Sequence, residues 1–291
     1  MDKVIFIIGI FVLAIVLRRC GVVRENHAGH LVRYVMALSL PCLTLVSIGT
    51  LRLRQAHLET AVIAWLVMAT GVLLSYCTGK FLGFTGKRLR VFILVSTFPN
   101  TAFLGYPFAY SLFGGDGLSY AIIYDQIGMF PLFLTLGLFI AGGREGISQL
   151  PSFPPLIALI AAIALNRAGL PPSGLFARVL GAIGWTTLPM TIFIIGLKVR
   201  FAALRDIKGV TASIILRMLI MPAFLFISLH FLGLKGLPYN VAILETAMPP
   251  ALITGIVSMQ YRLDEDLAVS CISVGTVISL ILFSIAMLAK G

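Results

Sequence analysis

The chain has 291 residues, of which 59% are hydrophobic and only 11% are charged. A soluble domain carries about 25% charged residues, so this composition excludes an ordinary soluble protein and predicts an all-α polytopic membrane protein. The net charge of +11 does not indicate nucleic-acid binding. Its lysines and arginines lie in short loops beside apolar runs, where they orient spans and meet anionic lipids.

Ten apolar segments are long enough to be transmembrane helices. The first contains a short apolar core from Val4 to Leu17, and we interpret it as a retained span because Arg18 and Arg19 follow it without a cleavage site. The loops are short, so we expect no attached soluble domain. The predicted spans cover roughly residues 3–17, 29–50, 59–79, 91–113, 118–141, 154–170, 179–198, 210–232, 238–259 and 267–289.

The basic residues are unequally shared between the two sides of this arrangement. Of the 22 lysines and arginines, seven fall on the side of the N-terminus and fourteen on the other side, with Arg217 inside a span. Cytoplasmic loops carry the excess of positive charge. The sequence therefore predicts a multi-pass protein of the cell (inner) membrane with both termini on the outer face.

Two of the predicted spans are interrupted near their middle. Span four contains Pro99 and Pro107, and span nine contains the pair Pro249-Pro250. Each proline lacks a backbone donor and disfavours helical dihedrals in the residue before it. Broken backbone at this depth is tolerated only where protein or a wet cavity surrounds it. Two broken spans in corresponding halves of a chain indicate a transporter's binding site.

The two halves of the chain repeat one another. Pro41 and Pro189 open similar runs, and Pro99 and Pro249 lie in the two broken spans. The members of each pair are about 150 residues apart, which predicts two homologous units of five spans each, residues 1–146 and 150–291. Because five is odd, the second unit enters the membrane from the opposite side. The broken helices 4 and 9 are then expected to cross near the midplane.

Such a crossing brings together helix ends that carry opposite partial charges. The N-terminal ends of the half-helices favour an anion and the C-terminal ends favour a cation. This arrangement predicts a carboxylate substrate with a coupling cation, such as sodium or a proton. The alternative is that the ends satisfy one another through water.

Polar side chains near the breaks are candidates for binding and coupling. Asn100 and Thr101 can bind substrate or cap freed backbone locally. Glu245 and Asp125 lie inside spans, where a carboxylate must be paired, protonated or bound to an ion. Arg217 can attract an anion, neutralise an acid or extend toward the lipid headgroups.

No pattern of residues indicates an enzyme. The four histidines show no metal-ligand spacing, and the stretch around Lys87 lacks the spacing of a phosphate loop. Asp116 is expected in an external loop only nine positions from Asp125, which argues against a pair of facing catalytic aspartates. We therefore expect no cofactor and no resident metal beyond a coupling ion.

At these residues the chain resembles the auxin efflux carrier family, which includes bacterial malate-permease-like carriers and the plant PIN-type exporters, within the bile acid/auxin transporter superfamily. The resemblance covers essentially the whole chain. The matching pieces are Pro99-Asn100-Thr101 with Gly105-Tyr106-Pro107, Leu40-Pro41, Tyr124-Asp125, and Ala247-Met248-Pro249 with Tyr261.

The resemblance implies ten spans in two inverted repeats. Spans one, two, six and seven would form a scaffold, often dimeric, and spans three to five and eight to ten a moving transport unit of elevator type. By looser similarity to the bile-acid sodium symporters, Glu245, Met248 and Asn100 fall where a cation site is lined. That group has polar amides where this chain has Pro249-Pro250. Sodium at Glu245 and Asn100, and a proton on Glu245 or Asp125, both stay candidates.

These observations lead to one functional hypothesis and one alternative. The hypothesis is a secondary carrier of a small organic carboxylate, with a symporter as its candidate type, membrane lipids around it and a homodimer as its candidate assembly. The alternative is a non-transporting membrane receptor on a carrier scaffold. The expected substrate-binding residues are Pro99, Asn100, Thr101, Met248, Pro249 and Pro250, and the expected coupling residues are Glu245, Asp125 and Asn100.

Overall fold

The computed structural model describes residues 2–24, 27–51, 54–143, 153–199 and 206–290. Within these ranges the chain is helical apart from connections and one isolated β-bridge. The first part contains α1 (Asp2–Arg19), α2 (His27–Tyr34), η1 (Val35–Ser39), α3 (Leu40–Gly49), α4 (Gln55–Phe81), α5 (Gly86–Thr97), η2 (Thr101–Gly105), α6 (Tyr106–Ile123), η3 (Tyr124–Met129), α7 (Phe130–Leu132), η4 (Phe133–Gly137) and α8 (Leu138–Ala141). The second part contains α10 (Pro154–Arg167), α11 (Gly174–Trp185), α12 (Thr187–Lys198), α13 (Ile207–Ile215), η6 (Leu216–Ile220), α14 (Met221–Phe231), α15 (Leu237–Thr246), α16 (Leu252–Gln260) and α17 (Glu265–Lys290).

The η elements are π-helical turns, and prolines explain most of them. The turns η1, η2, η3 and η6 each end two residues before a proline, at Pro41, Pro107, Pro131 and Pro222. A proline ring clashes with the carbonyl four residues earlier and cannot donate to it. A wider turn at that carbonyl relieves the clash, so the helix continues past the proline without breaking.

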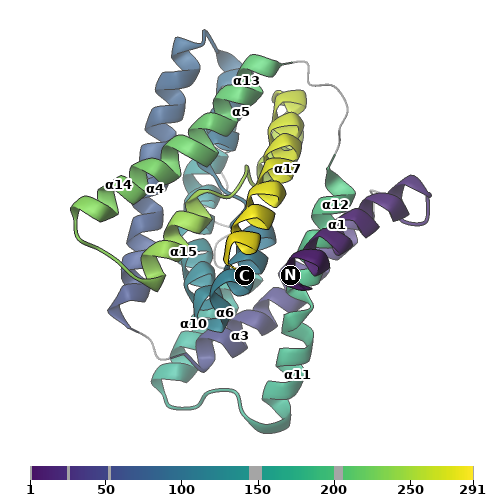
Figure 1. Cartoon of the computed structure of the whole chain (residues 1–291), viewed down its shortest axis with the longest axis vertical. Helices are drawn as coiled ribbons and strands as arrows, with labels where there is room; N and C mark the ends of the chain where they lie inside the picture. The colour runs from purple at the N-terminus through teal and green to yellow at the C-terminus, as the bar shows by residue number, and fades with distance from the viewer. Residues whose placement is uncertain (1, 25–26, 52–53, 144–152, 200–205, 291) are drawn as a thin grey trace.

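The helices pack in two groups (Figure 1). In one group α1 lies against α12, and α3 lies against α10 and α11. Small residues permit this approach: a Cβ on Gly184 would overlap the backbone of Leu43, and one on Gly196 would overlap Phe11 O. In the other group α4 packs on α5 and η3, α15 packs on α6, and α17 packs on α5, α13 and α16. Close packing at small residues is the usual source of helix association in lipid.

Each predicted span coincides with helical segments in the described residues. Six stretches are individually long and apolar enough to cross a membrane: His27–Gly49, Gln55–Phe81, Thr101–Ala141, Gly174–Lys198, Ile207–Phe231 and Glu265–Met287. The two interrupted spans are divided into shorter helices, α5 with the start of α6 and α15 with α16. The predicted boundary between the two halves, near residues 146–150, lies outside the described residues.

The connection between spans four and five differs from the expected loop. The stretch Thr101–Ala141 is helical throughout except for a kink at Gly114, whose φ of 70° and ψ of −159° are dihedrals that glycine adopts without strain. Asp116 therefore lies within α6, just after the kink, and not in an extended loop. A single glycine is enough to turn the chain here because it has no Cβ.

Candidate functional site

The two interrupted helices meet at their breaks. Pro99 and Pro250 form an antiparallel bridge, in which Asn100 N donates to Pro249 O at 2.7 Å and Ala251 N donates to Phe98 O at 2.9 Å. Neither proline can donate, so the residue after each one supplies the hydrogen bond. The sequence repeat pairs Pro99 with Pro249, whereas the bridge pairs Pro99 with Pro250. Two backbone donors that we expected to be free for an anion are therefore occupied by the opposite break.

Asp125 is held by hydroxyl groups from the segment that follows the first break. Its side chain is buried in η3, where Thr101 Oγ1 donates to Oδ1 and Tyr106 OH donates to Oδ2 at 2.8 Å. Thr101 thus bonds a neighbouring carboxyl group instead of capping its own helix. Asp125 therefore accepts hydrogen bonds from two hydroxyl groups, and no cationic side chain among the described residues pairs with it.

Glu245 has no such partners. It is fully buried near the C-terminal end of α15, and neither carboxylate oxygen has a hydrogen-bond partner among the described residues. The carboxyl group lies directly against Gly105 in η2, where a Cβ would overlap both oxygens. A carboxylate left unpaired in such surroundings costs several kcal/mol or more, so this group is suited to carry a proton or to hold an ion.

Asn100 is also buried and incompletely bonded. It is 2% exposed, it precedes η2, and its Nδ2 has no partner among the described residues. Local capping by its side chain is therefore not observed. Met248 and the two prolines of the second break are buried as well, and a Cβ on Gly275 of α17 would contact both Pro249 and Pro250.

A small cavity, which we call the crossing cavity, lies beside the first break. It has a volume of about 30 Å³, enough for about one water molecule and too small for an organic anion. Its polar lining is Asn100, Thr101 and Asp125. Met36 and Leu40 line it from the η1–α3 side, so it lies between the two helix groups. Of the expected substrate-binding residues, Pro99, Asn100 and Thr101 line it and Met248, Pro249 and Pro250 do not.

Arg217 does not extend toward the headgroups. It is fully buried in η6, where Nη1 donates to Thr97 O at 3.0 Å and Nε donates to Met248 O at 3.3 Å. Of the three alternatives for Arg217, extension toward the lipid headgroups is therefore contradicted. The side chain is long enough to reach both breaks from a neighbouring helix. The position of Arg217 in the sequence does not reveal these contacts.

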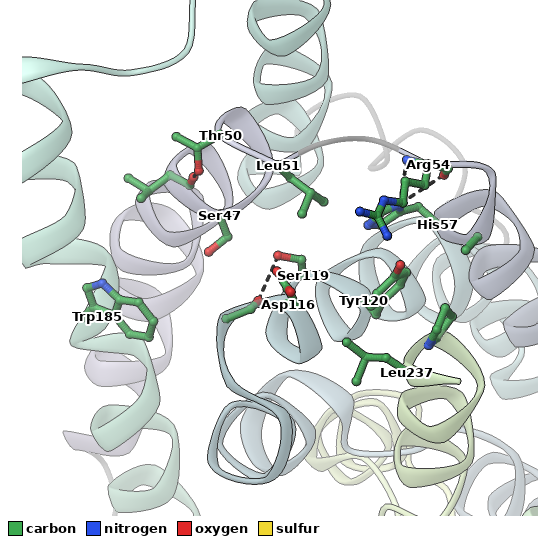
Figure 2. Close-up of a pocket in the computed structure, with 14 residues that line it drawn as sticks. Ser47, Thr50, Leu51, Arg54, His57, Asp116, Ser119, Tyr120, Trp185 and Leu237 are labelled. Atoms are coloured by element: carbon green, nitrogen blue, oxygen red, sulfur yellow. Dashed lines mark hydrogen bonds between the residues drawn. The ribbon is translucent and has the colours of Figure 1, made fainter. Parts of the chain in front are cut away.

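A second and much larger pocket, the wide pocket, lies between the helix groups (Figure 2). Its volume is about 710 Å³, within the usual range for small-molecule sites. Figure 2 shows Arg54 and His57 on one wall, Trp185 on the opposite side, and Asp116 with Ser119 between them. The full lining is Val46, Ser47, Thr50, Leu51, Arg54, Ala56, His57, Gly115, Asp116, Ser119, Tyr120, Trp185, Leu237 and Pro238.

Sequence reasoning missed this pocket, and His57 shows why. His57 lies in the first turn of α4, where it is buried, accepts a hydrogen bond from Arg54 N at Nδ1 (3.0 Å) and stacks on Tyr120 with 4.3 Å between ring centroids. The lining comes from α3, α4, α6, α11 and α15. No spacing along the chain signals a pocket assembled from five helices.

Comparisons with known proteins place the chain among transporters. A model of the family described as "Membrane transport protein", the family of the auxin efflux carriers, matches residues 1–153 and 148–287. An uncharacterised transporter of Methanothermobacter thermautotrophicus is 30% identical over 289 residues, covering 96% of this chain and 95% of the relative. An uncharacterised transporter of Methanocaldococcus jannaschii is 29% identical over 299 residues, covering 98% and 97%. The chain therefore belongs to the membrane transport protein family, as a multi-pass membrane transporter and not an enzyme.

Proposed function

We propose that this transporter is a secondary carrier of a small organic carboxylate. The observation that carries the proposal is the crossing cavity, where the unpartnered Nδ2 of Asn100 lies beside the paired breaks. The helical segments η2 and α16 begin directly after these breaks. Helix N-termini and an amide donor together favour an anion.

The two helix groups suit an elevator mechanism. In this proposal residues 1–146 and 150–291 form two inverted five-span repeats with crossing helices 4 and 9. The group of α1, α2, α3, α10, α11 and α12 is the scaffold, and the remaining helices are the transport unit. Asn100, Thr101 and Asp125 belong to the transport unit, and Met36 and Leu40 to the scaffold. The crossing cavity holds about one water molecule as it stands, so in this proposal it widens between the two groups before a substrate binds at Asn100 and Thr101. The bound substrate then moves with the transport unit past the scaffold.

Coupling is assigned to a proton on Glu245. Its two oxygens lack hydrogen-bond partners, and no group of three or more His, Cys, Asp or Glu that could hold a metal ion occurs among the described residues. Asp125 accepts two hydrogen bonds already, so it is better suited to position Thr101 and Tyr106. Sodium bound at Glu245 and Asn100 is the competing assignment. Uptake that requires a pH gradient would indicate the proton, and uptake that requires a sodium gradient would indicate sodium.

Replacing Asn100 with alanine is expected to weaken carboxylate binding about tenfold or more, because a hydrogen bond to a charged group contributes about 1.5–3 kcal/mol. The melting temperature of the free protein should not fall, since Nδ2 has no hydrogen-bond partner to lose within the described part of the chain. The measurement is the shift in melting temperature of detergent-purified protein across a panel of carboxylates, which reports affinity. Uptake into liposomes is measured with the strongest ligand.

Ser258→Ala is the matched control, because its buried hydroxyl donates to Thr254 O within its own helix. It should bind and transport as the wild type does. If no carboxylate shifts the wild-type melting temperature and none is taken up under any gradient, the proposal is wrong. A carboxylate that binds without any flux would favour the receptor alternative.

The wide pocket is proposed as the vestibule through which substrate enters from outside. In this proposal both termini, and with them Arg54 and Asp116, lie at the outer face, because the excess of basic residues is on the opposite side. In cells, cysteine introduced at Ser47 should react with a membrane-impermeant maleimide, whereas cysteine at Arg262 should react only after permeabilisation. Both variants need a background without the exposed native Cys20 and Cys77. The reverse pattern of labelling would invert the topology.

A further inference from the structure

One buried arginine holds the carbonyl ends of both interrupted helices. Thr97 is the last residue of α5, and Met248 follows the end of α15 by two residues. The Arg217 guanidinium donates to both carbonyls, at 3.0 Å and 3.3 Å. A single side chain from η6 thereby joins two segments that are far apart in the sequence.

The contacts follow the symmetry of the breaks. Phe98 O and Pro249 O each accept a hydrogen bond from the opposite break. Thr97 and Met248 each directly precede these residues, so they occupy equivalent positions on the two sides. Two consecutive carbonyls at each break are therefore satisfied, one by the opposite backbone and one by Arg217. Free carbonyls at such depth would otherwise cost several kcal/mol each.

These carbonyls form the kind of place that attracts a cation. The C-terminal end of a helix carries partial negative charge, and unwound carbonyls with helix C-terminal ends coordinate the coupling ion in other secondary transporters. Arginine is permanently charged and presents its donors in a rigid planar fork. Its charge is fully removed from solvent here, and its Nη2 has no hydrogen-bond partner among the described residues. The two carbonyl ends, through Nη1 and Nε, and the acidic Glu245 nearby offset part of the cost of this burial.

We propose that Arg217 is a built-in cation of the crossing, which occupies the position where a mobile metal cation would otherwise bind the carbonyl ends of α5 and α15. The paired breaks then keep their geometry without sodium. Its importance for transport rests on the proposed carrier function, since coupling would be left to Glu245. The cation position itself is a property of the folded protein, and it can be tested without any substrate.

The first test uses the wild-type protein in detergent. Its melting temperature is measured in sodium, potassium and choline chloride at equal ionic strength, and we expect no difference among the three. A sodium-specific rise that persists in Glu245→Gln would show a vacant cation site at the carbonyl ends and overturn the proposal. A rise that is lost in Glu245→Gln would place sodium at Glu245 and leave the carbonyl ends to Arg217. A protein that fails to transport any carboxylate would still give a clear result here, so the two proposals fail independently.

The second test removes the built-in cation. Arg217→Ala is expected to lower the melting temperature, and millimolar guanidinium chloride should restore part of the loss by binding between the two carbonyl ends. Gln126→Ala is the control, because it removes another buried side chain whose Nε2 donates to Thr44 Oγ1, outside the breaks. Guanidinium should not stabilise this control or the wild type.

Two outcomes of the second test count against the proposal. Guanidinium that fails to stabilise a folded Arg217→Ala protein, or stabilises the control equally, would mean that Arg217 does not fill a cation position. If Arg217→Ala does not fold, Arg217→Lys retains the charge and Arg217→Met retains most of the volume. The lysine variant should then have the higher melting temperature, and the reverse order would contradict the role of charge.

Discussion

Replacing Glu245 with glutamine is expected to abolish uptake driven by an imposed pH gradient while exchange of substrate at equal pH persists. Glutamine preserves the shape of the side chain but cannot release a proton. Because Glu245 has no hydrogen-bond partner among the described residues, the change removes no protein hydrogen bond, and glutamine keeps the contact with Gly105. The melting temperature should therefore not fall. Accumulation and exchange are measured in liposomes that contain the same amount of each variant.

Glu59→Gln is the matched control for this experiment. Glu59 is another carboxyl group of the transport unit, and its Oε2 accepts a hydrogen bond from Tyr239 OH at 2.6 Å. Glutamine keeps an acceptor for that bond, so gradient-driven uptake should stay close to that of the wild type. Accumulation by Glu245→Gln at the wild-type level would remove the coupling role from Glu245. A requirement for a sodium gradient instead of a pH gradient would replace the proton with sodium.

The sequence predicts the breaks because proline acts locally. Pro99 and the Pro249-Pro250 pair disfavour helix continuation whatever surrounds them, and the approximate sequence repeat predicts that the two breaks lie at corresponding positions in the two halves. The observed bridge between Pro99 and Pro250 agrees with two broken segments that meet. The repeat suggests that Pro99 pairs with Pro249, but the bridge pairs Pro99 with Pro250. This shift of one residue is needed because Pro250 has no N–H group, so the donor on that side is Ala251.

The destinations of long polar side chains could not be predicted in the same way. Arg217 and Glu245 both lie inside apolar spans, and their positions alone do not distinguish a surface, a neighbouring helix or a site. The packing of the helices determines where each side chain lies. Arg217 in η6 contacts both breaks, whereas Glu245 is enclosed against η2. The pairing of Asp125 with Thr101 and Tyr106 likewise depends on how η3 lies beside η2.

Gly105 is a residue whose importance appears only in three dimensions. Its place in the sequence suggests a helix breaker, yet it lies in the helical turn η2 with ordinary helical dihedrals. The Glu245 carboxyl group occupies the space that a side chain at position 105 would take. Glycine is therefore required here by the close approach of a carboxyl group and not by backbone conformation.

Gly105→Ala is expected to abolish gradient-driven uptake as completely as Glu245→Gln does. The new methyl group must displace the carboxyl group from its enclosed position, and overpacking of this kind costs about 1–3 kcal/mol. Without a clash the same substitution in a helix would stabilise the protein by about 0.8–1.0 kcal/mol. The sign of the change in melting temperature therefore distinguishes the two situations, and Gly9→Ala, where a Cβ meets nothing within 4 Å, serves as the control.

A double-mutant cycle identifies Glu245 as the cause. Contacting residues show a coupling energy of about 0.5–3 kcal/mol in such cycles, so Gly105→Ala should cost clearly less stability in a Glu245→Ala background than in the wild type. An equal cost in both backgrounds would mean that the methyl group disturbs the backbone of η2 and not the carboxyl group. Loss of uptake in Gly105→Ala together with a strong coupling energy would show that transport requires Glu245 to stay at this contact between the two interrupted helices.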